Sequence, residues 1–467
     1  MHLFWLIFLP FLSLIILNLL PKAINKRISF AWASILSLMQ LVLVFIPGCG
    51  SCGFSVIDSL SLMILFCIGI VTFVTLFVSR QFINPEKFGN FVNVILVALI
   101  GMNGAALARD VFTLYVYLEI TAVASFILIA LDKDLLGFEG AFKYLLMSAV
   151  ASVLMISAIA LLLILTGSTN FSEIHLALAS PEKNNVMLTT VTIGIYLVAL
   201  FIKSGLMPFH GWLPDAYSSA PATVSIFLAG IVTKVVGVYA LIRVMISVLG
   251  FNHASQTVIL LIGALSVILG ALTCLTQSDF KRMLSYSSIS QVGYIILGLG
   301  SGTPLGIAGA TLHIFNHSIF KSLLFVNSAA VEKQTGLRDI DKMSGLAQKM
   351  PITGISSILG SLSAAGLPPL AGFWSKLIII IALWVSGFYV YSVIAILGSI
   401  LTLAYFLLLQ RRVFFGKLKD EFVNIKEAGF NLAFPMVLLS VIIIIAGIFA
   451  PLILDKFILS FTRSIGG

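Results

Sequence analysis

The stretch Gly205-Leu206-Met207-Pro208-Phe209-His210-Gly211-Trp212 interrupts a long apolar run and has a counterpart in Gly366-Leu367-Pro368-Pro369-Leu370-Ala371-Gly372-Phe373. Both stretches follow the pattern G-L-x-P-x-x-G-aromatic. Proline removes a backbone donor and clashes with the preceding turn, and glycine relaxes the backbone, so each stretch is predicted to break a helix. Paired breaks at corresponding places are typical of transporters built from two inverted repeats. Two unrelated proline-containing turns are the alternative.

The composition around these stretches is that of a membrane protein. Of the 467 residues, 60% are hydrophobic and 10% are charged, whereas soluble domains have roughly 45–50% and 25%. Apolar runs of about 20 residues, long enough to cross the hydrocarbon core, follow one another along the chain. Residues 1–20 lack a basic start and a small-residue cleavage site, so they are predicted to form a transmembrane helix and not a removable signal peptide.

The sequence therefore predicts an all-α polytopic membrane protein of about fourteen transmembrane helices. The predicted helices are residues 3–20, 28–47, 58–78, 91–108, 110–131, 139–165, 187–207, 222–249, 256–276, 283–300, 304–331, 350–386 (broken in the middle), 388–410 and 432–454.

The net charge of +9 is an orientation signal and does not indicate binding to nucleic acid, because the basic residues alternate between loops. One set of loops carries only Arg109, Lys183, Arg243, Lys456 and Arg463. The other carries Lys22, Lys26, Arg27, Arg80, Lys87, Lys133, Lys143, Lys281, Arg282, Lys333, Arg338, Lys342, Lys349, Arg411, Arg412, Lys417, Lys419 and Lys426. The positive-inside rule predicts that this richer set is cytoplasmic, with both termini on the outer side of the cell (inner, cytoplasmic) membrane.

Four lysines and one glutamate fall inside apolar spans: Lys203, Lys234, Lys321, Lys376 and Glu119. A charged side chain at the centre of a bilayer helix costs about 3 kcal/mol, so such residues are usually functional or paired. An unpaired carboxylate would be more costly still, and Lys203 is the expected partner of Glu119. A purely structural ion pair that holds two helices together is the alternative.

His313, His317 and Lys321 are spaced by four residues, which places them on one face of a helix. Histidine titrates near neutral pH, and an apolar surrounding favours the neutral form of an amine. Such a stripe can pass a proton along a chain of waters. Histidines that only fill space in the core are the alternative.

No motif predicts a metal site or a cofactor. The chain has no H-E-x-x-H pair with a third ligand, no phosphate-binding G-x-x-x-x-G-K-[ST] loop and no iron–sulfur cysteine spacing. Direct ATP-driven transport by this chain is therefore excluded. Cys49 and Cys52 form a C-x-x-C that fits a disulfide, a redox pair or half of a metal site. Cys67 and Cys274 are expected to be packing residues.

Five segments between about residues 100 and 385 resemble one known family. They are 201–216 (FIKSGLMPFHGWLPDA), 233–243 (TKVVGVYALIR), 279–288 (DFKRMLSYSS), 316–325 (NHSIFKSLLF) and 366–376 (GLPPLAGFWSK). They are similar to the antiporter-like subunits shared by respiratory complex I, Mrp-type cation/proton antiporters and membrane-bound hydrogenases. Residues 234–240 are similar to Mrp subunits, whereas residues 313–321 and 337–347 are similar to the hydrogenase-type and complex I subunits. The resemblance therefore does not decide among the three groups.

This resemblance implies two inverted five-helix repeats in which helices seven and twelve are broken. The implied organisation is 1–90 for helices one to three, 91–250 for the first repeat, 251–410 for the second, and 411–467 for a cytoplasmic loop and helix fourteen. The resemblance also implies a role in proton translocation for each buried group: Glu119 and Lys203 as the initial pair, Lys234 as the middle lysine, His313, His317 and Lys321 as the central relay, and Lys376 as the exit residue.

The predicted function is proton translocation by a membrane subunit of a multisubunit assembly, without a cofactor or metal of its own. The resemblance implies other membrane subunits as partners, and peripheral hydrogenase or iron–sulfur subunits in some assemblies. Protons are the expected ion, and sodium is an alternative. The competing functions are a stand-alone transporter of a small solute, a quinone-associated redox subunit and a structural scaffold.

Overall fold

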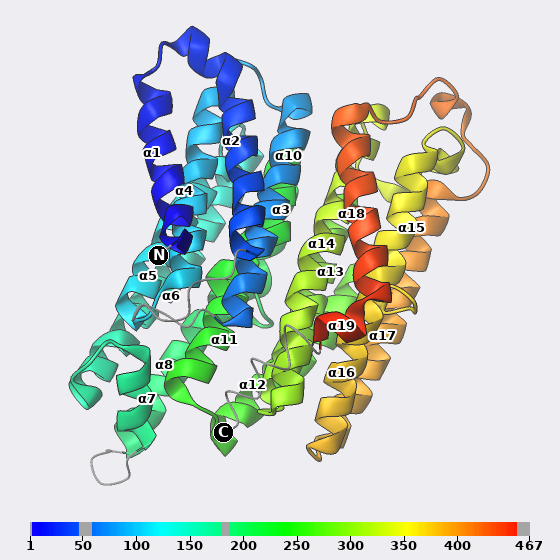
Figure 1. The fold of residues 1–467 in the computed structure, drawn as a ribbon. Coiled ribbons are helices and arrows are strands. Elements are labelled where there is room, and N and C mark those ends of the chain that lie inside the picture. Colours follow the sequence, from blue (N-terminus) through cyan, green and yellow to red (C-terminus); the bar gives the residue numbers. More distant parts are fainter. Residues whose placement is uncertain (1, 46–57, 180–185, 455–467) are drawn as a thin grey trace.

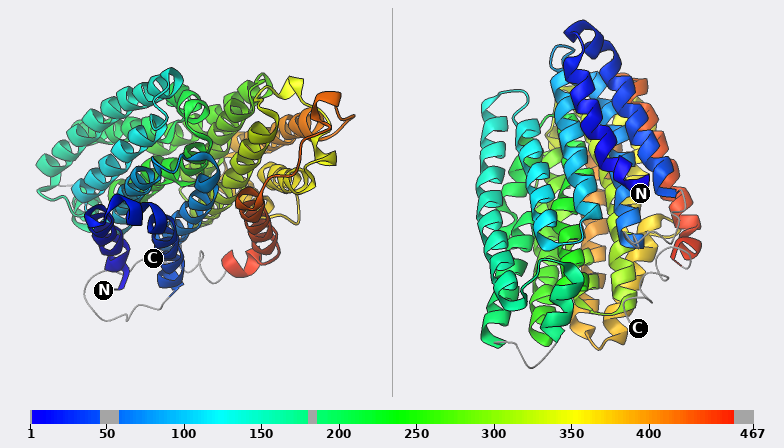
Figure 2. Two further views of the ribbon diagram at one scale, coloured as in Figure 1. Left: turned by 90° about the horizontal axis from the view of Figure 1, so that it is seen from above. Right: turned by 60° about the vertical axis from the view of Figure 1, so that its left-hand side comes forward.

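The computed structural model describes residues 2–45, 58–179 and 186–454. Every regular element in these ranges is helical, and no strand is present among them. Most helices run along one common axis, as Figure 1 shows, and they pack into a bundle that is wider than it is deep when seen from above (Figure 2). In Figure 1 the chain up to about residue 250 forms one side of the bundle and residues 253–454 form the other.

The helices of the first side have the following bounds: α1 Trp5–Leu19, α2 Lys22–Phe45, α3 Ser59–Phe82, α4 Phe88–Leu107, α5 Val111–Ile129, α6 Leu135–Thr166, α7 Phe171–Ala179, α8 Val186–Ser204, α9 Trp212–Ser219, α10 Ala222–Phe227 and α11 Ala240–Val244. Three π-helical segments, Leu228–Val232, Lys234–Tyr239 and Met245–Leu249, continue α10 and α11 into one long helix.

The second side consists of α12 His253–Leu275, α13 Phe280–Gly300, α14 Pro304–Thr335, α15 Pro351–Ala365, α16 Ala371–Val385, α17 Tyr389–Leu409, α18 Phe430–Ile448 and α19 Ala450–Ile453. Among the described residues, ten helices are long and apolar enough to cross a membrane, and α1, α15 and α16 are shorter apolar helices. The prediction of an all-α polytopic membrane protein is therefore confirmed.

Aspartates fix where several helices begin. The side chains of Asp58, Asp110, Asp134 and Asp279 accept hydrogen bonds from backbone N–H groups in the first turns of α3, α5, α6 and α13. These N–H groups have no acceptor within the helix, so without the aspartates they would be left without a hydrogen bond.

Both predicted helix breaks are confirmed. Helix α8 ends at Ser204 and α15 at Ala365, and each is followed by a glycine in the left-handed region, Gly205 at φ 66° and Gly366 at φ 84°. Side chains satisfy part of the freed backbone. The indole Nε1 of Trp212 donates to the Ile202 carbonyl oxygen at 3.0 Å, and the Met207 N–H donates to Ser266 Oγ at 3.1 Å.

Several predicted helix boundaries are wrong. Helix α2 begins six residues before the predicted residue 28, α3 extends to Phe82, and the short helix α7 is missing from the prediction. Helix 432–454 is divided into α18 and α19 at Phe449, just before Pro451. Local capping and proline decide these ends, whereas an apolar run marks only the middle of a helix.

The prediction that Arg243 and Lys281 lie in loops is also wrong. Arg243 lies on α11 with 9% of its surface exposed, and Lys281 lies on α13 with 1% exposed. Both residues lie near helix ends. At such positions the sequence does not distinguish a loop residue that sets membrane orientation from a buried residue in an ion pair. Cys49, Cys52, Lys183, Lys456 and Arg463 lie outside the described residues.

Candidate functional site

The candidate residues lie on five separate helical elements. Glu119 is on α5 and Lys203 is at the end of α8; Lys234 is in a π-helical segment, His313, His317 and Lys321 are on α14, and Lys376 is on α16. The four lysines and two histidines are at most 3% exposed. Glu119 differs, because 28% of its side chain is exposed.

Glu119 and Lys203 form the ion pair that the sequence analysis expects. Lys203 Nζ lies 2.9 Å from Glu119 Oε1. Ser152 on α6 donates its hydroxyl to the same Oε1 at 2.6 Å, and the hydroxyls of Ser148 and Ser152 both lie 3.4 Å from the ammonium. The two serines, spaced by four on α6, are the available sequence signal for this contact. They hold the pair in one geometry.

Lys234 is completely buried, and its ammonium donates to the carbonyl oxygen of Ala229. The lysine begins a π-helical segment that ends at Tyr239. A π-helical turn leaves carbonyl groups without their usual donor and is frequent at functional sites. The irregular backbone therefore supplies the acceptor for a lysine that has no carboxylate partner among the described residues.

The stripe on α14 lies in the core of the bundle. The rings of His313 and His317 are nearly parallel, with centroids 6.2 Å apart and an interplanar angle of 9°. His313 Nδ1 lies 2.8 Å from Ser375 Oγ. Within the described part of the chain, neither ring nitrogen of His317 has a hydrogen-bond partner. Lys321 Nζ donates to the Leu284 carbonyl oxygen at 2.9 Å and also contacts Ser287 Oγ, both on α13.

Lys376 follows the second break and points at an aromatic face. Its Nζ is 4.2 Å from the centre of the Tyr294 ring and has no hydrogen-bond partner among the described residues. Asn316 holds the start of α16 against α14, because its Nδ2 donates to the Ala371 carbonyl oxygen at 2.8 Å and to Ser375 Oγ at 3.0 Å. Tyr294, Asn316 and Ser375 are site residues that the sequence analysis does not identify.

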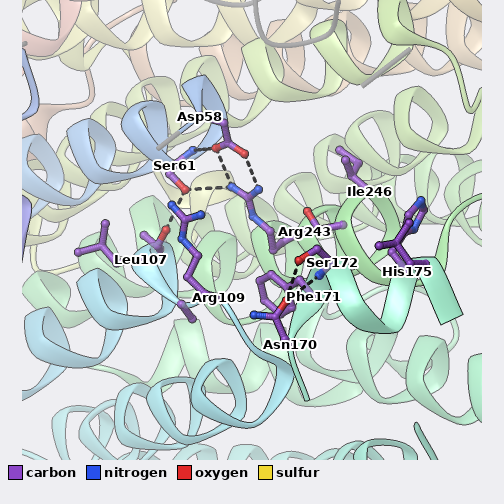
Figure 3. Close-up of a pocket in the computed structure, with 14 residues that line it drawn as sticks. Asp58, Ser61, Leu107, Arg109, Asn170, Phe171, Ser172, His175, Arg243 and Ile246 are labelled. Carbon is purple, nitrogen blue, oxygen red and sulfur yellow. Dashed lines mark hydrogen bonds and ion pairs between the residues drawn. The ribbon is translucent and has the colours of Figure 1, made fainter. Parts of the chain in front are cut away.

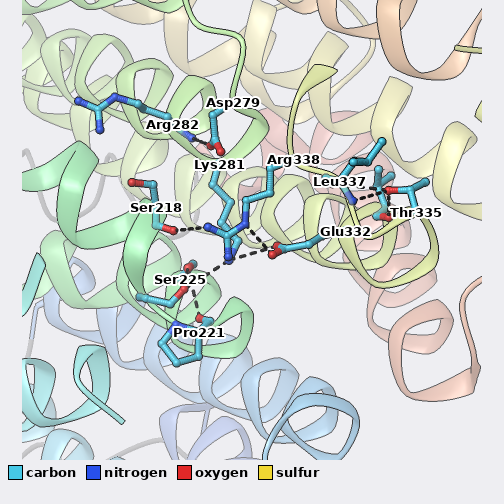
Figure 4. A network of polar contacts seen from close by, with 12 residues as sticks. Ser218, Pro221, Ser225, Asp279, Lys281, Arg282, Glu332, Thr335, Leu337 and Arg338 are labelled. Atoms are coloured by element: carbon cyan, nitrogen blue, oxygen red, sulfur yellow. Dashed lines mark hydrogen bonds and ion pairs between the residues drawn. The ribbon is translucent and has the colours of Figure 1, made fainter. Parts of the chain in front are cut away.

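A second carboxylate–lysine pair, in which the lysine is buried and the carboxylate is partly exposed, lies at the end of the bundle where α13 begins and α14 ends (Figure 4). Lys281 Nζ is 3.3 Å from Glu332 Oε2 and 3.3 Å from the Ala220 carbonyl oxygen. Arg338 Nε donates to the other oxygen of Glu332 at 2.6 Å. The pair is missed in the sequence analysis because both residues stand near helix ends.

A cavity of about 500 Å³ lies beside the start of α3 and is lined by Asp58, Arg109, Phe171, His175 and Arg243 among others (Figure 3). Arg243 forms a bidentate ion pair with the Asp58 carboxylate through its two terminal nitrogens, and its Nη2 lies 2.7 Å from Asp58 Oδ1. The Arg243 Nε lies 3.2 Å from the Tyr239 hydroxyl. Burial alone would raise the pKa of Asp58, but the hydrogen bonds and positive charge of Arg243 outweigh it. The pKa of Asp58 therefore lies below its ordinary value of 3.8.

Because of the Asp58–Arg243 pair, we expect the stability of the fold to fall at acidic pH. A carboxylate with a lower pKa in the folded protein stabilises it at higher pH, and this contribution is lost as the pH falls below 3.8 toward the folded-state value. We expect Asp58→Asn to lower the thermal unfolding temperature at pH 7 and to lose less stability than the unchanged protein between pH 5 and about pH 3. Glu86→Gln, at an exposed acid, is the control. Identical acid sensitivity of Asp58→Asn and the unchanged protein would contradict this role.

No group of three or more histidine, cysteine, aspartate or glutamate side chains that could hold a metal ion is present in the described ranges. The polar groups of the interior are thus mainly lysines, histidines, hydroxyls and amides. These groups can hold, donate and accept protons.

Comparison with known proteins matches this architecture. The sequence model of the family described as "NADH:quinone oxidoreductase/Mrp antiporter, TM" matches residues 108–402. The chain is 35% identical over 398 residues to a Na(+)/H(+) antiporter subunit of Alkalihalophilus pseudofirmus, an alignment covering 84% of this chain and 79% of that protein. It is also 35% identical over 326 residues to a NADH-quinone oxidoreductase subunit of Desulforudis audaxviator, covering 69% of this chain and 64% of that protein.

The fold also matches a solved structure over nearly its whole length. A chain of the Mrp complex from Dietzia sp. superposes with a TM-score of 0.88 at 23% identity, covering 99% of this chain and 96% of that chain. At this identity the likeness concerns the fold.

Proposed function

Because the chain belongs to the family of membrane subunits shared by NADH:quinone oxidoreductases and Mrp antiporters, we propose that it translocates protons within a multisubunit complex. The observation that carries the proposal is the Glu119–Lys203 ion pair, with its 2.9 Å contact, at one end of a series of buried lysines and histidines. The proposed path runs from Lys203 through Lys234 and the α14 stripe to Lys376.

The proposed first step is separation of the Glu119–Lys203 pair. At an effective dielectric constant of about 20, moving two unit charges from about 3 to about 6 Å apart costs about 3 kcal/mol, the equivalent of about a hundred-fold change in proton affinity. An ammonium that loses its carboxylate partner gives up its proton more readily. A change of charge or shape in a neighbouring subunit supplies the separation, and the proton moves toward Lys234. Reprotonation from the opposite side completes the cycle.

Unpaired polar atoms support a water-filled path between the later groups. His313 Nε2, both ring nitrogens of His317, Asn316 Oδ1, Ser318 Oγ and Lys376 Nζ are buried and form no hydrogen bond within the described residues. Buried polar groups in proteins are almost always satisfied, commonly by internal water. Side chains that only hold helices together would be paired with one another, so this pattern favours a conduit over a scaffold.

We further propose that the chain crosses the membrane about fourteen times, through α1 to α6, α8 with α9, residues 222–249, α12, α13, α14, α15 with α16, α17 and α18. The proposed division is 1–90, an inverted pair of repeats at 91–250 and 251–410, and 411–467. Lys203 precedes its break and Lys376 follows its own.

Helices α6 and α14 support the inverted repeat. Each has 32 residues and ends in Thr–Gly with the glycine in the left-handed region. After each of these helices, one residue forms an isolated β-bridge with the aspartate that caps the helix before it. After α6, Asn170 pairs with Asp110, the cap of α5; after α14, Asp339 pairs with Asp279, the cap of α13. Helix α7, which follows the first of these turns, lies at the lower end of the bundle in Figure 1, and α15, which follows the second, begins at the upper end.

For the orientation, we propose that the end rich in lysine and arginine faces the cytoplasm and that both termini lie outside the cell membrane. The proposed partners are other membrane subunits, with peripheral hydrogenase or iron–sulfur subunits if the complex is redox-driven. Sodium is the alternative ion. The subunits that co-purify with the tagged chain identify the type of complex. Iron–sulfur subunits indicate a redox pump, and small membrane subunits alone indicate an Mrp-type antiporter.

The experiment that tests the function is reconstitution of the intact complex, purified through a tag on this chain, into sealed vesicles. A pH-sensitive dye inside the vesicles is expected to report proton movement when the complex is supplied with its driving reaction or cation gradient. The absence of both proton and sodium movement from a fully assembled complex would contradict the proposed function.

A further inference from the structure

Lys281 is a buried ammonium whose carboxylate partner is partly exposed. Only 1% of its surface is exposed, while its partner Glu332 has 24% of its side chain exposed and Arg338, which pairs with the same carboxylate, has 38%. Figure 4 shows the Lys281 and Arg338 side chains next to each other, both directed at Glu332. The three side chains therefore form a short polar connection from the basic end of the bundle into its interior.

Glu332 has a second cationic partner. Arg338 donates to Glu332 Oε1 at 2.6 Å and to the Ser218 carbonyl oxygen at 3.0 Å, so one carboxylate oxygen stays paired without Lys281. Replacing a buried ion pair by uncharged side chains of similar size is often neutral or stabilising. A lysine that is costly to bury and is not the only partner of its carboxylate requires another explanation, and proton transfer supplies one.

The geometry leads from this pair to the central relay. Glu332 lies eleven residues after Lys321 on α14, close to three full turns, so the two residues share a face. On α13, Lys281 precedes Leu284 and Ser287, the two residues whose oxygens hold the Lys321 ammonium, by three and six residues. That spacing corresponds to about 4.5–9 Å along the helix axis.

Buried hydroxyls line the same interval. Ser285 and Ser288 lie one and two turns after Lys281 on α13, and Ser328 lies one turn before Glu332 on α14; all three are buried. Hydroxyl groups both donate and accept hydrogen bonds, so they can orient a short chain of water between two amines. On α14, Glu332 lies about 16 Å along the helix axis from Lys321, so the proposed connection to Lys321 requires several waters in series.

We propose that Lys281 and Glu332 form a second proton-loading site, which delivers protons from the basic side of the membrane to Lys321. The Lys281 ammonium gives one proton to the neutral amine of Lys321. The resulting Lys281 amine is then reprotonated by way of Glu332 by a hydronium ion from the aqueous phase on the basic side, which becomes water, and no electron moves. This inference rests on the proposed function, in which the Glu119–Lys203 switch triggers discharge of the path.

The test is the double variant Lys281→Met/Glu332→Gln in the intact complex, with translocation into sealed vesicles measured per assembled complex. Glu332→Gln alone is expected to reduce assembly, because it leaves the buried Lys281 ammonium without a carboxylate, whereas Lys281→Met leaves Glu332 paired with Arg338. The double variant is expected to assemble normally and still to translocate at least three-fold more slowly. A double variant that assembles and runs at the native rate would assign the pair a structural role and overturn the proposal.

Lys281→Arg is the second variant. It keeps the charge and the ion pair, but a guanidinium does not release its proton in proteins, so the same slowing is expected and a native rate would overturn the proposal. Arg282→Gln, at the neighbouring and 39% exposed arginine, is the matched control and is expected to keep the native rate. The translocation rate of Lys203→Ala is measured in parallel. If Lys203→Ala keeps the native rate, the proposed function fails. If Lys203→Ala loses translocation while the Lys281 variants keep the native rate, only the loading site is rejected.

Discussion

Replacing Lys321 by alanine is expected to slow translocation by the intact complex at least ten-fold. Lys321 is completely buried at the end of the α14 stripe, and its ammonium bridges to the Leu284 carbonyl oxygen and Ser287 Oγ on α13. Alanine holds no proton and leaves a gap after His317. Because the substitution also removes a costly buried charge, the complex is expected to assemble. A pH-sensitive dye in sealed vesicles measures the rate per assembled complex.

Two controls separate proton transfer from packing in this experiment. Lys321→Arg keeps a long cationic side chain that does not release a proton, so its rate is expected to be as low as that of Lys321→Ala. Lys342→Ala removes a lysine with 67% of its side chain exposed and is expected to leave the rate unchanged. Translocation by Lys321→Ala within two-fold of the native rate would show that the proton path avoids α14.

Replacing Glu119 by alanine is expected to lower both the amount of assembled complex and its translocation rate. The change leaves the Lys203 ammonium, 2% exposed, without its carboxylate. Breaking a buried pair from one side typically costs about 3–5 kcal/mol, and less here because Glu119 is partly exposed. The assembled fraction is expected to translocate at least ten-fold more slowly, because no ion pair remains to be opened. Blue-native electrophoresis measures assembly and the vesicle assay measures the rate.

The double variant Glu119→Gln/Lys203→Met distinguishes a switch from a scaffold. It removes both charges and retains side chains of similar size, so assembly is expected to recover toward the native level. If the pair acts as a switch, translocation stays low. If the rate recovers together with assembly, the pair only holds α5 and α8 in place, and its role in the relay is wrong.

The parts of this fold that were predictable from the sequence depend on local chemistry. Gly205, Gly366 and the prolines beside them set the two helix breaks through backbone geometry alone, which needs no knowledge of neighbouring helices. The partnership of Glu119 with Lys203 followed from the cost of a lone charge in an apolar span. The shared face of His313, His317 and Lys321 followed from helical periodicity.

The parts that were missed depend on residues distant in the sequence. Ser148 and Ser152 are ordinary small residues until α6 packs beside Glu119, and Ser375 acquires its role only when α16 lies against His313. Lys281 stands near a helix end, where its sequence context equals that of an exposed loop lysine. Only the approach of Glu332 and Ala220 shows that the ammonium is buried and held.

The pairing of the buried cations differs systematically along the proposed path. Lys203 has a carboxylate, Lys234 and Lys321 have backbone carbonyl oxygens, and Lys376 has only the face of Tyr294 among the described residues. A carboxylate favours the charged form of a lysine most strongly and an aromatic face favours it less. This gradient is consistent with loading at Lys203 and release beyond Lys376.

The central claim is that one continuous path passes through the middle of the chain, and translocation by the Lys234→Ala complex tests it most directly. Lys234 is fully buried, contacts neither Glu119 nor Lys376, and is the proposed link between the first pair and the α14 stripe. With assembly at the native level, the steady-state rate in sealed vesicles is expected to fall at least ten-fold. A native rate in Lys234→Ala, alongside the loss expected in Lys321→Ala, would contradict a path that runs through both lysines in series.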